Sequence, residues 1–204
     1  MDVAWDHCRR AFADAAGWFV HAVERVGDRW EDPGLGEWDV RALVGHTSRS
    51  FLTVEAYLDR PAAAVAVASP ADYLRAARVA AAGAAVAARG REAGAALGAD
   101  PAAAVAEIAA RVLRLVDAQD GAEVLTTIAG GMRLRDYLPT RTFELVVHTA
   151  DLATALGEPP DVPATAAAQA LQVVTDVALA DGVAGPLLLA VTGRSAAGAG
   201  FSVL

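Results

Sequence analysis

The segment from residue 136 to residue 156 constrains the fold most, because the helix that it predicts is apolar on nearly every side. Leu145, Leu152 and Leu156 lie along one side of this helix, and Phe143 and Val147 lie along another. At about 100° per residue, these positions leave one narrow stripe for polar side chains. A helix of this kind is buried in a globular protein, so other elements have to surround it.

Helical spacing of apolar residues continues through most of the chain, and turn residues separate the segments. Asp39 is a predicted N-cap, and Pro70 and Pro101 stand at the first position of their helices. The further predicted helices span residues 2–26, 39–59, 70–97, 101–116 and 163–179. A spacing of two near 123–134, and a similar pattern near 187–204, predict two short β-hairpins. The fold class is therefore mainly α, a helical bundle with a small sheet, as a single domain over residues 1–204.

Composition excludes several classes of function. The chain is 55% hydrophobic and 21% charged, which excludes disorder as its main state. Its formal net charge of -8 argues against a protein that binds nucleic acid through phosphates. All 17 basic residues are arginine, so neither a Schiff-base lysine nor a Walker-A loop is present. Cys8 is the single cysteine, which excludes an internal disulfide and a cysteine-based zinc cluster.

The sequence also predicts where the protein works. The first residues lack the basic start and the apolar run of a signal peptide. The longest apolar stretches are rich in alanine and are interrupted by arginine, glycine or proline, so none of them predicts a membrane span. We therefore expect a soluble protein of the reducing cytoplasm, with no membrane partner.

The polar stripe of the buried helix holds Arg141, Glu144, His148 and Asp151. Burying four ionisable groups is costly unless they satisfy one another or hold a metal ion. The Glu-x-x-x-His spacing places a carboxylate and an imidazole one turn apart, where both can reach one divalent ion. His46 is the candidate third ligand, because small side chains surround it on its own helix. Two imidazoles and one carboxylate leave a fourth position open, as in catalytic zinc sites.

The same residues also allow an interpretation without a metal. Arg141 then pairs with Glu144, and Asp151 pairs with His148, as a buried structural network. His46 is then an ordinary, partly buried histidine of its helix. The spacing alone leaves both interpretations open.

Two motifs give the chain a resemblance to a known family. The first is residues 35–46, LGEWDVRALVGH, and the second is residues 135–157, RDYLPTRTFELVVHTADLATALG. With them, the chain resembles the mycothiol-dependent maleylpyruvate isomerase family, which belongs to the wider DinB-like group of metal-binding four-helix bundles. The tail segment Thr192-Gly193-Arg194 is similar to the closing strand of that family.

The resemblance implies a zinc ion held by His46, Glu144 and His148. It also implies that the thiol mycothiol binds the metal as a thiolate and adds to the double bond of maleylpyruvate. Rotation and elimination then give fumarylpyruvate. Other members of the group are similar to S-transferases, which keep the adduct. The expected partners are thus a small-molecule thiol and an electrophile, and a homodimer is compatible with this group.

Two further residues are candidates for catalytic roles. Arg141 either anchors an acidic substrate or thiol, or pairs with Glu144. Asp151 either fixes the tautomer of His148 or is a carboxylate on the helix surface. The family's isomerase carries a further C-terminal domain, for which only the segment 187–204 is present here. We therefore also consider a non-catalytic metal-binding or regulatory module, and a metal-free scaffold.

Overall fold

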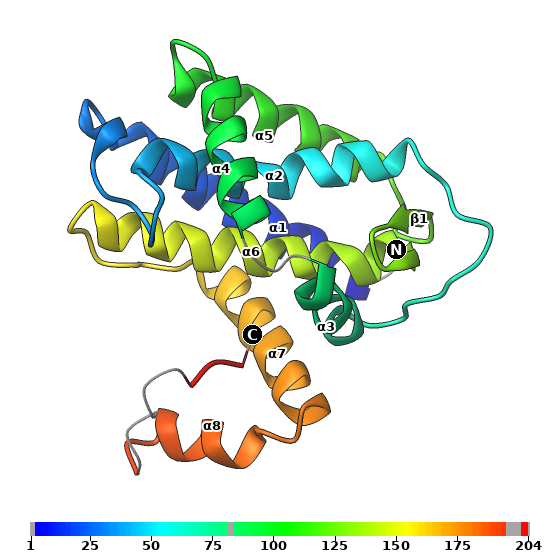
Figure 1. Ribbon diagram of the computed structural model, residues 1–204. Coiled ribbons are helices and arrows are strands. Elements are labelled where there is room, and N and C mark those ends of the chain that lie inside the picture. The colour runs from blue at the N-terminus through cyan, green and yellow to red at the C-terminus, as the bar shows by residue number, and fades with distance from the viewer. Residues whose placement is uncertain (1–2, 81–83, 195–200, 204) are drawn as a thin grey trace.

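The helix α6, from Leu134 to Ala155, lies at the centre of the molecule (Figure 1). The computed structural model describes residues 3–80, 84–194 and 201–203. Half of the α6 residues are buried, as the nearly continuous apolar surface of this segment predicts. Asp136 occupies its first turn, where a carboxylate suits the positive end of the helix dipole.

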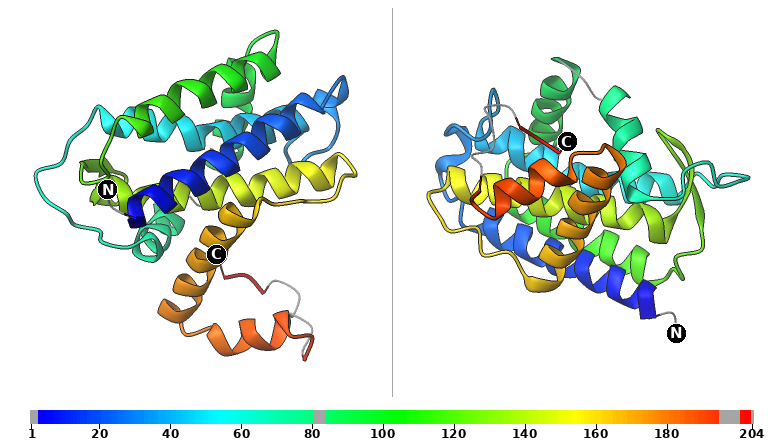
Figure 2. Two further views of the ribbon diagram at one scale, coloured as in Figure 1. Left: turned by 180° about the vertical axis from the view of Figure 1, so that it is seen from behind. Right: turned by 90° about the horizontal axis from the view of Figure 1, so that it is seen from below.

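Four helices form the bundle. They are α1 (Val3–Glu24), α2 (Val40–Leu58), α5 (Pro101–Asp117) and α6. The helices α1 and α2 each pack against both α5 and α6, which gives a square of four neighbours. Figure 1 and the left view of Figure 2 show these four helices side by side. The expectation of a mainly α, DinB-like four-helix bundle with a small sheet is confirmed.

Helix caps and a buried aromatic cluster explain how α1 and α2 form and pack. Asp39 accepts a hydrogen bond from the backbone N–H of Ala42 and so caps α2, as predicted. A short 3₁₀ turn, Arg29–Glu31, lies in the preceding loop. Phe12 and Phe51 meet edge to face with their ring centroids 5.8 Å apart. Both rings are fully buried, so this contact joins α1 to α2.

The prediction of one helix over residues 70–97 was wrong. The structure has α3 (Pro70–Ala80) and α4 (Ala84–Ala96), and residues 81–83 lie outside the described part. The two helices pack on different partners, α3 on α6 and α7, and α4 on α2. Gly94 explains the second contact, because a Cβ there would lie 2.6 Å from the carbonyl oxygen of Arg41. Only glycine lets the two backbones approach so closely.

The first predicted hairpin is present. It joins β1 (Val124–Thr127) to β2 (Gly130–Arg133) as an antiparallel pair, with Leu125 opposite Met132. Both of these side chains are buried, as an apolar spacing of two predicts. The loop after α2 joins the hairpin through an isolated bridge between Pro61 and Leu125.

The second predicted hairpin was wrong. The apolar run near residue 187 belongs to the helix α8 (Ala184–Val191), which follows α7 (Ala164–Ala180). A short leucine-rich run fits a strand or a helix equally well by periodicity, and alanine and leucine are strong helix formers. Thr192 is the C-cap of α8, so the resemblance of the tail to a closing strand fails there. Residues 201–203 have no regular structure, and residues 195–200 and 204 lie outside the described part.

Beyond the bundle, α7 packs on α6, α1 and α3, and α8 packs on α7. Figures 1 and 2 show α7 and α8 extending away from the bundle. Several large apolar side chains on these two helices are exposed, among them Leu171, Leu179 and Leu188. Within the described residues, no helix combines the length and hydropathy that crossing a membrane requires.

Candidate metal centre

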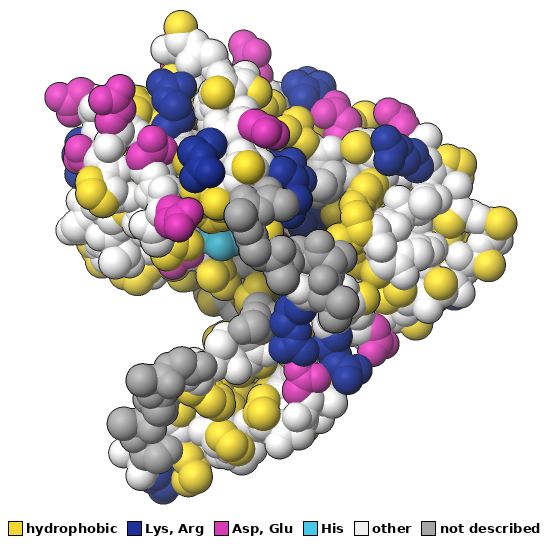
Figure 3. All heavy atoms as spheres, in the orientation of Figure 1, with side chains coloured by type: hydrophobic (Ala, Val, Ile, Leu, Met, Phe, Trp, Pro, Cys, Tyr) yellow, Lys and Arg dark blue, Asp and Glu magenta, His cyan; other side chains and the backbone are white. Residues whose placement is uncertain are grey.

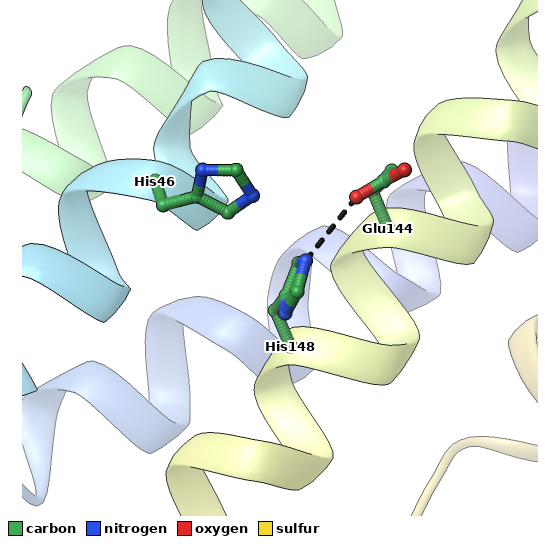
Figure 4. A group of neighbouring side chains, drawn as sticks. All are labelled: His46, Glu144 and His148. Carbon is green, nitrogen blue, oxygen red and sulfur yellow. Dashed lines mark ion pairs between the residues drawn. The ribbon is translucent and has the colours of Figure 1, made fainter. Parts of the chain in front are cut away.

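Three side chains from two helices converge between α2 and α6. His46 comes from the second turn of α2, and Glu144 and His148 lie one turn apart on α6. One potential ligand atom of each residue lies within 4.8 Å of the others. Figure 4 shows one ring nitrogen of His46 directed toward Glu144, and His148 directed toward the same space. The structure therefore brings together the three residues that the sequence singled out as a ligand set.

His148 is held between two carboxylates. Its Nε2 atom lies 3.2 Å from Oε2 of Glu144, and its Nδ1 atom lies 3.0 Å from Oδ2 of Asp151. Burial opposes protonation of the ring, but the hydrogen bonds to Asp151 and Glu144 outweigh it and raise the pKa of His148 to about 9. Because Asp151 takes up Nδ1, the nitrogen that faces Glu144 and His46 is Nε2.

His46 has the opposite electrostatic environment. Burial and the neighbouring charge of His148 lower the pKa of His46 to about 4, so its ring is neutral at pH 7. Its Nδ1 atom is buried and has no hydrogen-bond partner in the described part of the chain. The indole of Trp38 stacks on the ring, with the centroids 4.4 Å apart. A neutral imidazole keeps one nitrogen lone pair, which is the state that ligates metals.

Glu144 completes the set as an anion. Burial favours the neutral acid, but the hydrogen bond with His148 and the charge of Arg141 outweigh it and lower the pKa of Glu144 to about 2. The set thus offers two imidazoles and one carboxylate, which suits zinc. Donor atoms around a tetrahedral zinc ion lie about 3.3 Å apart, given bonds of about 2.0–2.1 Å. Small side-chain rotations therefore bring these three donors to that spacing, so the residues present fit the ion.

Arg141 is held by aromatic rings and not by a carboxylate. Within the described residues it forms no ion pair with Glu144 or any other acid. Its guanidinium carbon instead lies 5.4 Å from the ring centroid of Tyr73 and 5.1 Å from that of Tyr137. Its Nε atom donates a hydrogen bond to Oγ1 of Thr140. Cation–π contacts with two tyrosines thus hold the charge in place without neutralising it.

A cavity of about 400 Å³ opens beside the three converging residues. His46 and Glu144 lie in its wall, together with Arg141 of α6 and Tyr73 of α3. The hydroxyl groups of Ser50 and Thr53, from the next two turns of α2, also line it. Figure 3 shows a histidine in a hollow of the surface, with arginine side chains nearby. The cavity has room for a small-molecule ligand next to the ligand set.

Sequence reasoning missed three residues around this cavity. Arg49 lies one turn beyond His46 on α2, and Arg89 enters the cavity from α4. Trp38 belongs to the motif at residues 35–46, but the sequence assigned it no role. In the structure its ring packs on His46. The three-residue spacing from His46 to Arg49 was a usable signal, since such residues share a helix face. The alanine-rich sequence around Arg89 contains no comparable signal.

Comparison with known proteins identifies one relationship. The family model described as the mycothiol maleylpyruvate isomerase N-terminal domain matches residues 13–153. The match begins in the middle of α1 and ends near the end of α6, so it includes α2 and α5, most of α6, part of α1 and the whole ligand set. No curated protein and no solved structure matches the chain.

Proposed function

Because the chain belongs to the mycothiol maleylpyruvate isomerase N-terminal domain family, we propose that it is a metal-dependent enzyme that uses mycothiol to modify a small electrophile. Zinc is the metal that the two imidazoles and the carboxylate suit. The reaction is an isomerisation or an S-transfer. The observation that carries this proposal is the convergence of His46, Glu144 and His148, with ligand atoms within 4.8 Å of one another.

The metal would keep a thiol ionised at neutral pH, and the thiolate is the reactive form of sulfur. The chain's own residues have separate tasks. Asp151 orients His148 through the 3.0 Å contact with Nδ1. Trp38 fixes the ring plane of His46. The cavity beside them holds the electrophile, and Arg141 presents a fixed positive charge in its wall.

The two reaction types share their first step. The thiolate sulfur forms a bond to a carbon of a conjugated double bond, and the electron pair of that bond moves onto the adjacent carbonyl group. In an isomerisation, rotation about the carbon–carbon bond that was the double bond precedes loss of the sulfur. The double bond then re-forms and the thiol is recovered. In an S-transfer, the carbanion takes a proton and the thioether is released. Consumption of thiol therefore distinguishes the two.

Metal content tests the ligand set. We expect the purified protein to retain about one zinc per chain, and His148→Ala to lose it, because three protein ligands hold zinc far better than two. The matched control is His21→Ala, since His21 lies on the exposed face of α1, near Glu24. Elemental analysis of the variants gives the answer. Full zinc content in His148→Ala would overturn the ligand assignment.

Turnover tests the chemistry. Zinc-loaded protein is incubated with mycothiol and maleylpyruvate, and in parallel with other conjugated electrophiles. Formation of the trans isomer indicates an isomerase, and zinc-dependent loss of free thiol indicates a transferase. If the protein holds zinc but does neither, it is the alternative, a non-catalytic metal-binding module. If wild-type protein holds no zinc and its melting temperature does not change when zinc is added, it is a metal-free scaffold.

A further inference from the structure

Three arginines from three helices line the cavity beside the ligand set. They are Arg49 of α2, Arg89 of α4 and Arg141 of α6. All three are half-buried. None of them forms an ion pair with a described acidic residue. Other arginines of the chain do pair with acids: Arg111 with Glu55, Arg25 with Glu158, and Arg75 and Arg78 both with Asp181.

One acidic residue, Glu144, is among the described lining residues, and its charge interacts with that of Arg141 although the two form no ion pair. The Oε2 atom of Glu144 is engaged with Nε2 of His148. The two amino groups of Arg141 make no hydrogen bond to the described protein, since only its Nε atom donates. Apart from His46, the remaining lining residues are uncharged: Ser50, Thr53, Tyr57, Tyr73, Ala77, Val86 and Ile128. The cavity is therefore a concave, positively charged surface with free N–H donors.

A half-buried guanidinium group without an ion pair has lost part of its hydration, and a bound anion compensates for that loss. The guanidinium group also matches a carboxylate in geometry, because its parallel N–H groups reach both oxygens. Arg49 shares a helix face with His46, one turn away, so an anion bound there lies next to the ligand set. The position suits the substrate of the proposed reaction.

We propose that Arg49, Arg89 and Arg141 form an anion subsite that binds a carboxylate group of the electrophile. Arg49 and Arg89 are then specificity-determining residues, which admit acidic electrophiles and discriminate against neutral ones of the same shape. The role of this subsite in turnover rests on the proposed function, but binding of the anion itself needs no metal. The subsite can therefore be tested on protein from which metal has been removed.

Succinate is a suitable probe, because it is a small dicarboxylate without an electrophilic double bond. Calorimetry on metal-free protein measures its affinity, and succinamide is the neutral control of the same length. We expect succinate to bind, succinamide to bind at least tenfold more weakly, and added salt to weaken succinate binding. Inorganic phosphate tests whether the site selects carboxylates. Phosphate binding as tight as that of succinate overturns the carboxylate assignment.

Arg49→Gln and Arg89→Gln should each weaken succinate binding about tenfold, the usual effect of losing one hydrogen bond to a charged group. The matched control is Arg91→Gln, because Arg91 is exposed on the same helix as Arg89 and does not line the cavity. Melting curves show whether each variant is folded. If folded Arg49→Gln and Arg89→Gln both bind succinate as wild type does, the proposal is wrong.

The outcomes separate the subsite from the metal centre. If the protein binds succinate through these arginines but takes up no zinc when zinc is supplied, the subsite is supported and the proposed function is removed. Zinc retention without succinate binding, in both metal-free and zinc-loaded protein, removes the subsite and leaves the proposed function intact.

Discussion

The indole of Trp38 stacks on the imidazole of His46, with the ring centroids 4.4 Å apart and the planes inclined by 33°. The indole N–H donates a hydrogen bond to the carbonyl oxygen of Ala87, 3.0 Å away on α4. A Cβ on Gly90 would lie only 2.7 Å from the indole ring, so α4 closes over it. Trp38 is thus a positioning residue, clamped by α4 and holding one ligand of the proposed metal centre.

We expect Trp38→Ala to weaken zinc binding about tenfold, because His46 gains rotamers that do not ligate. Trp38→Phe keeps an aromatic face against His46 and should stay within about threefold of wild type. Competition with a chromophoric chelator measures both affinities. A structural role alone would lower the melting temperature of Trp38→Ala without changing its zinc affinity, and that result would contradict the assignment.

Asp151 should also act through His148. Asp151→Asn removes the charge that sits 3.0 Å from Nδ1 but keeps an oxygen that can accept the ring proton. Partners of this kind contribute about 10- to 100-fold to metal affinity, so zinc should bind more weakly by that factor. The control is Glu107→Gln, which removes a negative charge from an exposed position on α5. Equal zinc affinity in Asp151→Asn and in the control would show that Asp151 has no influence on the centre.

Sequence patterns predicted the bundle because its signals are local. The apolar stripes and the cap at Asp39 belong to individual helices, and this cap is present. The two errors occurred where local signals are ambiguous. The alanine-rich segment 70–97 has no strong apolar stripe to show where one helix ends. The leucine run of α8 fits a strand as well as a helix, and only the three-dimensional context decides.

The same distinction between local and long-range signals applies to the residues of the candidate site. Glu144, His148 and Asp151 share one helix, so spacing alone predicted that they lie together, and the structure places them within hydrogen-bonding distance. The small side chains around His46 on its own helix made it the candidate third ligand, and the resemblance implied the same residue. Its approach to α6 depends on how α2 packs on α6, which spacing within one helix does not determine. Arg89 reaches the cavity only because glycines let α4 dock on α2. That these residues bind a metal stays a prediction.

Gly45 should be intolerant of alanine because of this helix contact. A Cβ on Gly45 would lie 2.1 Å from the backbone nitrogen of Gly94, so α4 would have to move. Overpacking of this kind costs about 1–3 kcal/mol. Alanine's better helix propensity recovers at most about 1 kcal/mol. We expect Gly45→Ala to lower the free energy of unfolding in urea, and to weaken zinc binding because Trp38 loses its clamp.

Gly17→Ala is the matched control for that variant. Gly17 lies inside α1, is exposed, and has nothing within 4 Å of an added Cβ. The same substitution there should raise the free energy of unfolding by about 0.5–1 kcal/mol through helix propensity alone. If both variants change stability in the same direction, the contact between α2 and α4 is not as tight as the structure shows.

Cys8 should be inert in the native protein although it is a free thiol. Its side chain is 5% exposed, and burial raises its pKa from 9.0 to about 12. A neutral, inaccessible thiol does not attack a disulfide reagent. We expect Ellman's reagent to label Cys8 fully in denaturant and only through slow opening of the fold under native conditions. Rapid stoichiometric labelling of the native protein at pH 8 would contradict this.

The same shift sets how stability depends on pH. Below pH 9 the thiol is neutral in the folded and in the unfolded chain, so its contribution to stability is fully present. Between pH 9 and about 12 only the unfolded chain loses the proton, so this contribution falls as the pH rises. The free energy of unfolding of wild type should therefore fall relative to Cys8→Ala by about 1.4 kcal/mol per pH unit in that range. Urea titrations of the two proteins at pH 8, 10 and 11 measure the difference, and parallel curves would show that burial does not protect the thiol.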